Sequence, residues 1–183
     1  MIRRLLHVTI ALTCVSCSMR DGGSPPPTAG TVNLQRYAGR WHEIARLPTP
    51  FQKDNESAIA DYGVNADGTL SVHNIAVRPD GSQHSIKGVA TSLNPPQHTK
   101  LAVRFSTWFG PLIPMPKEGN YWILYRDDHY QEAIVGTANR SFLWILARQP
   151  QVSDKHYQRL TDIARSAGYD TKRLIRTSSH SGH

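Results

Sequence analysis

From Trp41 onward, apolar and polar residues alternate over short runs, and turn-forming residues separate these runs. Alternation with a period of two is typical of strands that bury one face. The clearest turn is Ala66-Asp67-Gly68, because an Asp-Gly pair between two such runs is a strong signal for a hairpin. The pattern predicts eight strands, at residues 41–47, 57–65, 69–77, 82–93, 100–106, 120–125, 130–137 and 142–148.

One amphipathic helix is predicted after the last strand. Ser153 or Asp154 can cap its start, apolar residues then recur at helical spacing, and Gly168 is well placed to end it. Residues 169–176 predict a short ninth strand. Sequential strands joined by short hairpins favour an all-β fold, namely an eight-stranded antiparallel up-and-down barrel with one C-terminal helix packed outside.

The first residues have the pattern of an export signal. Arg3 and Arg4 precede an apolar run at 5–12, which is too short to span a bilayer. The segment that follows is rich in Gly, Ser and Pro, a composition that cannot build a core. The predicted organisation is a signal peptide at 1–16, a lipidated N-terminus with a flexible linker at 17–33, a barrel domain at 34–176 and a loose tail at 177–183.

Two cysteines end the export signal. Ser16 before Cys17 resembles the cleavage box of bacterial lipoproteins, so we expect Cys17 to carry a lipid that anchors the protein to a membrane. Cys14 is the weaker alternative, and an ordinary secretory leader cut nearby is the simpler one. In the same lipoprotein pattern, Ser18 rather than Asp after the lipidated cysteine implies export to the outer membrane.

Composition and charge exclude several classes of function. The chain of 183 residues suggests one domain plus ends, and 39% apolar with 19% charged residues is ordinary for a soluble fold. The formal charge is +7, but no cluster of Lys and Arg is interleaved with aromatic residues, so nucleic-acid binding is not predicted. Both cysteines precede the barrel, which therefore cannot contain an internal disulfide.

Three blocks of sequence carry a resemblance to a known family. Residues 37–46 read Tyr-Ala-Gly-Arg-Trp-His-Glu-Ile-Ala-Arg, residues 143–148 read Leu-Trp-Ile-Leu-Ala-Arg, and Phe109-Gly110-Pro111 lies in the long loop before the sixth strand. These blocks resemble the lipocalins, and specifically the bacterial outer-membrane lipoprotein lipocalins, to which apolipoprotein D and plant temperature-induced lipocalins are similar. The resemblance runs from about Leu34 to Ile175.

The resemblance implies a barrel that holds one small hydrophobic molecule. It implies a fatty acid or a lysophospholipid, carried or stored in the bacterial envelope by a protein that is lipid-anchored to the outer membrane and faces the periplasm. The alternatives are a scaffold or interaction lipoprotein without a specific ligand, and an enzyme that acts on lipids. The chain has no H-E-x-x-H, no G-x-S-x-G and no ordered Cys/His spacing, so no catalytic residue, metal site or cofactor is predicted.

Four residues at one end of the barrel are expected to be structural: Gly39, Trp41, Asp127 and Arg148. The Arg148 guanidinium can lie over the Trp41 indole, a cation–π contact of about 0.5–2 kcal/mol. Gly39 allows a positive φ or a close approach of another chain. The second lipocalin motif, usually Thr-Asp-Tyr, reads Arg126-Asp127-Asp128 here, so only its Asp is kept.

Every second residue of a barrel strand faces inward. With Trp41 setting the parity of the first strand, Glu43, Ala45 and Leu47 are expected inside. Small inward residues favour a cavity over a filled barrel, and these are Ala58, Ala60, Gly88, Ala90 and Ala133. The candidate ligand contacts are Glu43, Ala60, Tyr62, Asn74, Phe105, Tyr121, Tyr125, Phe142 and Trp144.

Glu43 is the unusual member of this set, because a buried carboxylate is costly unless it is paired or neutralised. We expect it to hydrogen-bond to a tyrosine or to an arginine near the closed end, and it can alternatively anchor a polar head group.

The cavity mouth is expected at four loops, residues 48–55, 78–81, 107–119 and 138–141. The third loop carries Trp108 and Phe109, and an exposed apolar loop marks a contact site. It can cover the cavity, touch a membrane or pair two molecules into a homodimer. The basic residues near this rim are candidates for holding a phosphate or carboxylate, and they are Arg46, Lys53, Arg78, Lys117 and Arg140.

Overall fold

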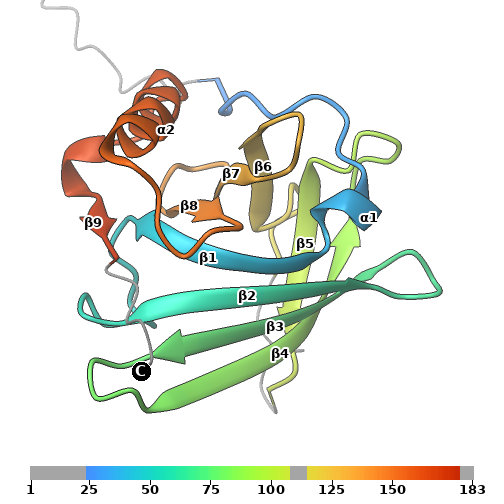
Figure 1. The fold of residues 1–183 in the computed structure, drawn as a ribbon. Helices are drawn as coiled ribbons and strands as arrows, with labels where there is room; N and C mark the ends of the chain where they lie inside the picture. Colours follow the sequence, from blue (N-terminus) through green and yellow to red (C-terminus); the bar gives the residue numbers. More distant parts are fainter. Residues whose placement is uncertain (1–23, 108–114, 178–183) are drawn as a thin grey trace, which may run out of the picture.

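Eight antiparallel strands follow one another around a closed barrel in the order of the sequence (Figure 1). The computed structural model describes residues 24–107 and 115–177. Each strand lies within two residues of one expected from the alternation, so the predicted fold class is confirmed. The strands are β1 (Gly39–Arg46), β2 (Ser57–Val64), β3 (Leu70–Val77), β4 (Gln83–Ser92), β5 (Lys100–Phe105), β6 (Tyr121–Arg126), β7 (Glu132–Gly136) and β8 (Leu143–Ala147).

Strand β1 closes the barrel by pairing with two neighbours on one edge. Its first half pairs with β2, where Trp41 lies opposite Ala60. Its second half pairs instead with β9 (Ile175–Arg176), where Ala45 lies opposite Arg176. The barrel wall therefore parts between β1 and β2 on the side of the mouth, and β9 occupies the edge of β1 there.

The ninth strand is shorter than the prediction of 169–176. The 3₁₀ helix η2 (Thr171–Arg173) takes up most of that segment, because the Asp170 side chain accepts a hydrogen bond from the Lys172 amide and starts a tight turn. Only Ile175 and Arg176 remain extended enough to pair with β1.

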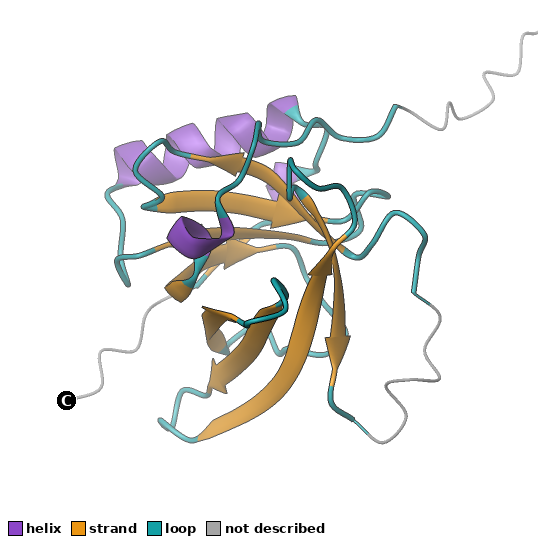
Figure 2. Cartoon of the chain, turned by 90° about the vertical axis from the view of Figure 1, so that its right-hand side faces the viewer, coloured by secondary structure: helices purple, strands orange, loops and turns teal. Residues whose placement is uncertain are grey.

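Helix α2 (Asp154–Ser166) lies outside the barrel, over one side of its wall (Figure 2). Ser153 caps it by accepting a hydrogen bond from the His156 amide, and Gly168, with φ of +88°, follows its end. Leu160 and Ala164 are fully buried against the outer faces of β1 and β6–β8. In residues 24–107 and 115–177, no helix has the length and apolar character needed to cross a bilayer.

Residues 24–33 run along the barrel, although the composition predicted a flexible linker through residue 33. The Ala29 amide donates to the Ile123 carbonyl and the Val32 amide to the Gln97 carbonyl, each at 2.9 Å. Arg140 in the β7–β8 loop donates to the Ser24 carbonyl at 2.8 Å. We call residues 24–33 the strap. The packed domain therefore begins at Ser24, ten residues before the expected boundary at Leu34.

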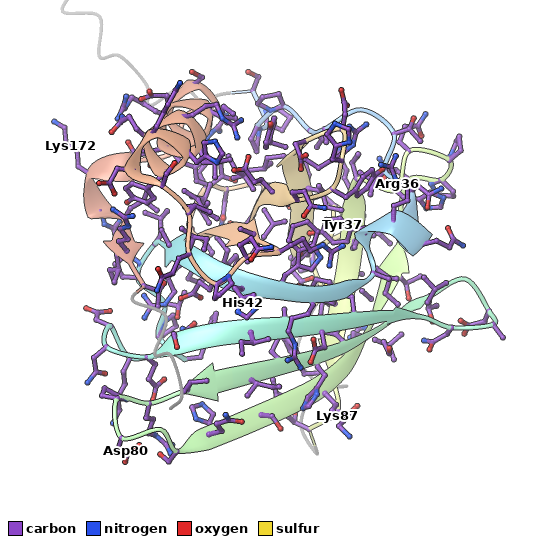
Figure 3. The ribbon with its side chains drawn as sticks, viewed as in Figure 1. Arg36, Tyr37, His42, Asp80, Lys87 and Lys172 are labelled. Carbon is purple, nitrogen blue, oxygen red and sulfur yellow. The ribbon has the colours of Figure 1, made fainter. Side chains whose placement is uncertain are left out.

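The strap leads into α1 (Leu34–Tyr37), a single helical turn that the sequence analysis did not predict. Asn33 caps α1 by accepting a hydrogen bond from the Arg36 amide, and the turn buries Leu34 and Tyr37. Figure 3 shows Tyr37 where α1 meets the barrel, whereas Asp80 lies at the distant β3–β4 hairpin. Helix α1 thus covers one end of the barrel and leaves the hairpin end open.

Candidate functional site: a cavity inside the barrel

A cavity of about 810 Å³ lies inside the barrel. It opens between the β1–β2, β5–β6 and β7–β8 loops, which contribute Gln52, Glu118 and Asn139 to its lining. Its wall is mostly apolar and includes the small residues Ala58 and Ala60, which leave room between the strands. Eight of the nine candidate contacts lie on its wall, and they are Glu43, Ala60, Tyr62, Asn74, Phe105, Tyr121, Phe142 and Trp144.

The ninth candidate, Tyr125, lies outside the barrel, so its predicted inward orientation is wrong. It packs against the α2 side of the wall, and the Arg159 guanidinium donates to its hydroxyl at 2.9 Å. The cause is a break in the β6–β7 register between Ile123 and Tyr125. A shift of one residue moves the following side chains to the other face.

The same error affects the end of β1. Ala45 and Leu47 were expected inside, but both are buried in the outer cluster beneath α2. The β1–β8 register shifts between Glu43 and Ala45, so the parity set by Trp41 holds only as far as Glu43. Glu43 is therefore the last inward residue before the shift.

Three tyrosines form the floor of the cavity. The hydroxyls of Tyr37 and Tyr121 lie 2.7 Å apart, and those of Tyr62 and Tyr121 lie 3.1 Å apart. The Tyr37 and Tyr62 rings stack with centroids 5.8 Å apart. Burial raises the pKa of Tyr62 to about 12 and the pKa of Tyr37 and of Tyr121 well above their usual value. These hydroxyls therefore stay neutral, and Tyr37 was missed because it comes from α1.

Glu43 is held from the mouth side of the cavity. One of its oxygens, Oε1, accepts hydrogen bonds from the Thr177 hydroxyl at 2.8 Å and from the Gln52 amide at 3.2 Å, and lies 3.5 Å from Arg46 Nε. Burial outweighs these contacts and raises its pKa from 4.5 to about 7. The expected tyrosine partner is wrong, and the arginine comes from the second half of β1 rather than from the closed end.

Two buried oxygens on the cavity wall accept no hydrogen bond from any described residue. They are Glu43 Oε2 and Asn74 Oδ1. The described wall residues include the carboxylates Glu43 and Glu118 but no lysine or arginine. Over residues 24–107 and 115–177, no three side chains of His, Cys, Asp or Glu come together to hold a metal ion. The wall is therefore suited to burying a mostly apolar molecule.

The rim of the mouth carries an exposed aromatic side chain that the sequence analysis did not single out. Phe51 is 64% exposed, and its ring centroid lies 5.8 Å from that of Phe142 and 6.5 Å from that of Trp144. This aromatic group lies where a ligand enters. Trp108 and Phe109, the predicted mouth-loop residues, lie outside the described residues.

The basic residues of the rim differ in their roles. Arg46 was a candidate for holding a phosphate or carboxylate at the rim, but it is fully buried and donates to the Lys53 carbonyl, so it is not exposed there. Arg78 lies 3.5 Å from the buried Glu56 carboxylate, and Arg140 donates to the Ala167 carbonyl. Lys53 and Lys117 are exposed. Three of the five cations therefore brace loops.

At the closed end, Arg148 and Trp41 make the predicted contact. The Arg148 guanidinium carbon lies 3.8 Å from the centroid of the Trp41 ring system. The guanidinium also donates to five carbonyl oxygens, those of Arg36, Tyr37, Ala38, Arg40 and Tyr130. Gly39 has φ of +98°, and a side chain there would press on Arg148. This end is a structural plug.

Asp127 shapes the turn beside the plug. Its Oδ1 accepts from the amides of Gln131 at 2.6 Å and Glu132 at 2.7 Å, which orders the β6–β7 turn. Tyr130 from this turn accepts a hydrogen bond from the Asn33 amide, so the turn holds the strap against the plug. The retained Asp of the second motif therefore has a structural role.

Comparisons with known proteins agree with this architecture. Residues 32–179 match the family model described as a lipocalin-like domain. The chain is 40% identical over 149 residues to temperature-induced lipocalin-1 of Arabidopsis thaliana, covering 80% of this chain and 78% of that protein. It is 33% identical over 177 residues to the outer membrane lipoprotein Blc of Escherichia coli strain K12, covering 94% and 96%.

More distant relatives share the same fold. Mouse apolipoprotein D is 32% identical over 159 residues, covering 83% of this chain and 79% of that protein. The crystal structure of lobster apocrustacyanin A1 superposes with a TM-score of 0.61 at 18% identity, covering 89% of this chain and 94% of that one. With a family model that spans the whole barrel and several relatives above 30% identity, the chain belongs to the lipocalin family.

Proposed function

We propose that this protein binds a single-chain lipid, a fatty acid or a lysophospholipid, inside the barrel and carries or stores it in the bacterial cell envelope. Lipocalins bind small hydrophobic ligands. The observation that carries the proposal is the cavity of about 810 Å³, whose mostly apolar wall ends in a few polar groups. Cavities of this size and polarity are typical of small-molecule sites. The proposal gives the barrel no catalytic step.

The apolar wall is sufficient for useful affinity. Burying a sixteen-carbon chain contributes up to about 13 kcal/mol at about 0.8 kcal/mol per methylene. Immobilising the chain and extracting it from a membrane remove much of this free energy. A remainder of about 8 kcal/mol corresponds to micromolar binding.

The proposal places the protein at the outer membrane, anchored through Cys17 and facing the periplasm. The support is the resemblance of residues 13–17 to a lipoprotein cleavage box, together with a relative named as an outer membrane lipoprotein. Cys17 itself lies outside the described residues. From Cys17 to Ser24 the chain advances seven residues, a reach of at most about 25 Å.

Because the strap of residues 24–33 is bound to the barrel, the short distance from Cys17 to Ser24 limits how far the mouth can lie from the membrane. Arg140, which binds the Ser24 carbonyl, belongs to one of the loops around the mouth. A lipid on Cys17 would therefore keep the mouth near the membrane surface. This is a tighter arrangement than a flexible linker through residue 33 would allow.

Lipid binding is tested by purifying the protein gently and identifying extracted lipids by mass spectrometry. We expect a lipid to co-purify, and a fatty acid or lysophospholipid to quench tryptophan fluorescence in a saturable manner, because Trp144 lies on the cavity wall. Replacing Ala60 by Phe narrows the cavity and should weaken the ligand affinity measured by quenching. Val89→Phe adds the same ring on the outer face of β4, where Val89 is 42% exposed, and should leave quenching intact.

Two results would contradict the proposal. Equal affinity in the Ala60→Phe and wild-type proteins would place the ligand elsewhere. Absence of any lipid, together with no quenching across a panel of lipids, would favour a scaffold or interaction lipoprotein in envelope maintenance.

A further inference from the structure

The barrel consists of two sheets joined at two seams, which are the β1–β2 and the β5–β6 boundaries. One sheet is β2–β3–β4–β5, and the other is β6–β7–β8–β1 with β9 at its edge. Within the first sheet, β2 and β3 pair along their whole length, from Ser57–Val77 to Val64–Leu70. At the two seams the pairing is confined to the part near the closed end, so the sheets separate toward the mouth.

The β5–β6 seam is spanned toward the mouth by a side chain instead of the backbone. The ladder joins residues 100–101 of β5 to residues 121–122 of β6. Beyond it, Asn120 Oδ1 accepts a hydrogen bond from the Val103 amide at 2.8 Å, and Asn120 Nδ2 donates to the Val103 carbonyl at 3.0 Å. A carboxamide carries the same donor and acceptor as a peptide group, so Asn120 replaces one pair of ladder hydrogen bonds.

Gly119 explains why the backbone itself does not continue this ladder. It has φ of +81°, and a side chain there would collide with the Leu101 carbonyl oxygen. The backbone at Gly119 therefore lies against Leu101, two residues short of Val103. The Asn120 side chain reaches further along β5 than the backbone does.

A second carboxamide spans the other seam. Strand β1 pairs with β2 over residues 39–42, and Glu43 follows this ladder on β1. Gln52 Nε2 donates to Glu43 Oε1 at 3.2 Å and to the carbonyl of Glu56, immediately before β2, at 3.3 Å. These hydrogen bonds are longer than those of Asn120, so Gln52 holds its seam less firmly.

The closed end joins the two sheets more extensively. The hydroxyls of Tyr62 in β2 and Tyr121 in β6 lie 3.1 Å apart. The strap donates hydrogen bonds to the carbonyls of Gln97, in the β4–β5 turn, and of Ile123 in β6, and so bridges the β5–β6 seam at this end. The closed end can therefore act as a hinge for the two sheets.

We propose that Asn120 and Gln52 are latches at the mouth, and that a ligand enters and leaves when they release and the β2–β5 sheet moves away from the β6–β1 sheet about the closed end. This rests on the proposed lipid-binding function and adds the route of entry. Both residues are positioning residues, because they set how often the mouth is open. Since entry and exit use the same opening, a weaker latch raises both rate constants by the same factor and leaves the dissociation constant unchanged while the closed state predominates.

The rate constants are measured by stopped-flow tryptophan quenching, with palmitate and a palmitoyl lysophospholipid as probes, because Trp144 lies on the cavity wall. Asn120→Ala removes two hydrogen bonds and should raise the association and dissociation rate constants at least about 5-fold each, with less than about 2-fold change in the dissociation constant. Gln52→Ala should act in the same direction by about 2-fold or more, because its hydrogen bonds are longer.

Asn65→Ala is the matched control. It removes a half-buried carboxamide whose hydrogen bond to Thr69 lies within the β2–β3 hairpin and crosses neither seam. Both rate constants should stay within about 1.5-fold of wild type. Unchanged rate constants in Asn120→Ala would overturn the latch. An Asn120→Ala variant that loses affinity through faster dissociation alone would show that Asn120 contacts the ligand instead.

Hydrogen exchange of the ligand-free protein tests the opening without any lipid. The Val103 amide is bonded to the Asn120 side chain, whereas β3 is paired on both sides along its length. The Val103 amide should exchange at least about 10-fold faster than the slowest amides of β3. Gln52→Ala, at the other seam, should speed Val103 exchange by about 2-fold or more, because one sheet moves as a unit.

The exchange data separate failure of the latch from failure of the proposed function. Val103 protection equal to that of β3, or Val103 exchange that is unchanged in Gln52→Ala, would overturn the common opening even if both probes bind. Failure of both probes to bind the wild-type protein would instead refute lipid binding, on which the route of entry rests.

Discussion

The buried carboxyl of Glu43 should make the barrel lose stability as pH rises from about 4.5 to about 7. Burial raises the pKa of Glu43 from 4.5 to about 7 in the folded protein, so the folded state holds this proton more tightly than the unfolded chain. The stabilisation is full below pH 4.5 and is lost as pH rises to about 7. A gap of about 2.5 pKa units corresponds to about 3 kcal/mol.

The assay is urea denaturation of wild type and Glu43→Gln at intervals from pH 4 to pH 8. Glutamine approximates the protonated carboxyl at every pH, so the difference between the two proteins isolates the titration of Glu43. Relative to wild type, the variant should gain about 3 kcal/mol between pH 4.5 and 7. Other groups, such as His42 with its lowered pKa, act in both proteins and cancel.

An ion pair with Arg46 would give the opposite sign. If the contact of 3.5 Å between Arg46 Nε and Glu43 Oε1 outweighed burial, the pKa of Glu43 would lie below 4.5. The variant would then lose stability relative to wild type as pH rises through the acid range. That result, or a difference that stays flat from pH 4 to 8, would refute the reasoning. Glu118→Gln, at an exposed rim position, should show no such trend.

Three further predictions concern the plug, the outer helix and the anchor. Arg148→Ala removes five hydrogen bonds and the Trp41 contact, and it should lower the free energy of unfolding by about 3–5 kcal/mol in chemical denaturation. The control Arg104→Ala, at an exposed position, should lower it by less than about 0.5 kcal/mol. Equal losses in the two variants would contradict the structural role of the plug. Leu160→Ala should cost about 2–4 kcal/mol, because Leu160 of α2 is fully buried against the barrel, and it should leave lipid affinity unchanged; weakened binding would show that α2 shapes the cavity. Cys17→Ser should move the protein from the membrane to the soluble fraction, and continued membrane partition would refute lipidation at Cys17.

The alternation of apolar and polar residues was enough to place all eight strands. It was not enough to predict, along the whole of each strand, which side chains face the inside of the barrel. The inward–outward alternation changes phase where the strand pairing is irregular, between Glu43 and Ala45 in β1 and between Ile123 and Tyr125 in β6. Both breaks lie under α2, so the displaced side chains remain buried on the outer face. An apolar residue can be buried either inside the barrel or beneath α2. The apolar pattern of the sequence therefore does not determine which of the two faces such a residue occupies.

The surroundings of Glu43 could not be predicted for a different reason. Its hydrogen-bond partners, Gln52 and Thr177, lie 9 and 134 residues away and are brought to it by a loop and by the end of the chain. Neither belongs to a strand with alternating residues. The sequence indicated that a buried carboxylate needs a partner, but only the pairing of one edge of β1 with β2 and then with β9 determines which groups are near.

The net charge of the chain does not predict the charge of its ligand. The formal charge of +7 suggests an affinity for anions, yet the described wall of the cavity carries two carboxylates and no lysine or arginine. Arginines of the closed end bind carbonyls and aromatic rings, as Arg148 does at Trp41 and Arg36 at Tyr130. Exposed cations such as Lys53 and Lys117 can attract an anionic surface to the mouth, because such attraction acts at a distance. Selection of the bound molecule depends instead on contacts inside the barrel, where the described wall is mostly apolar.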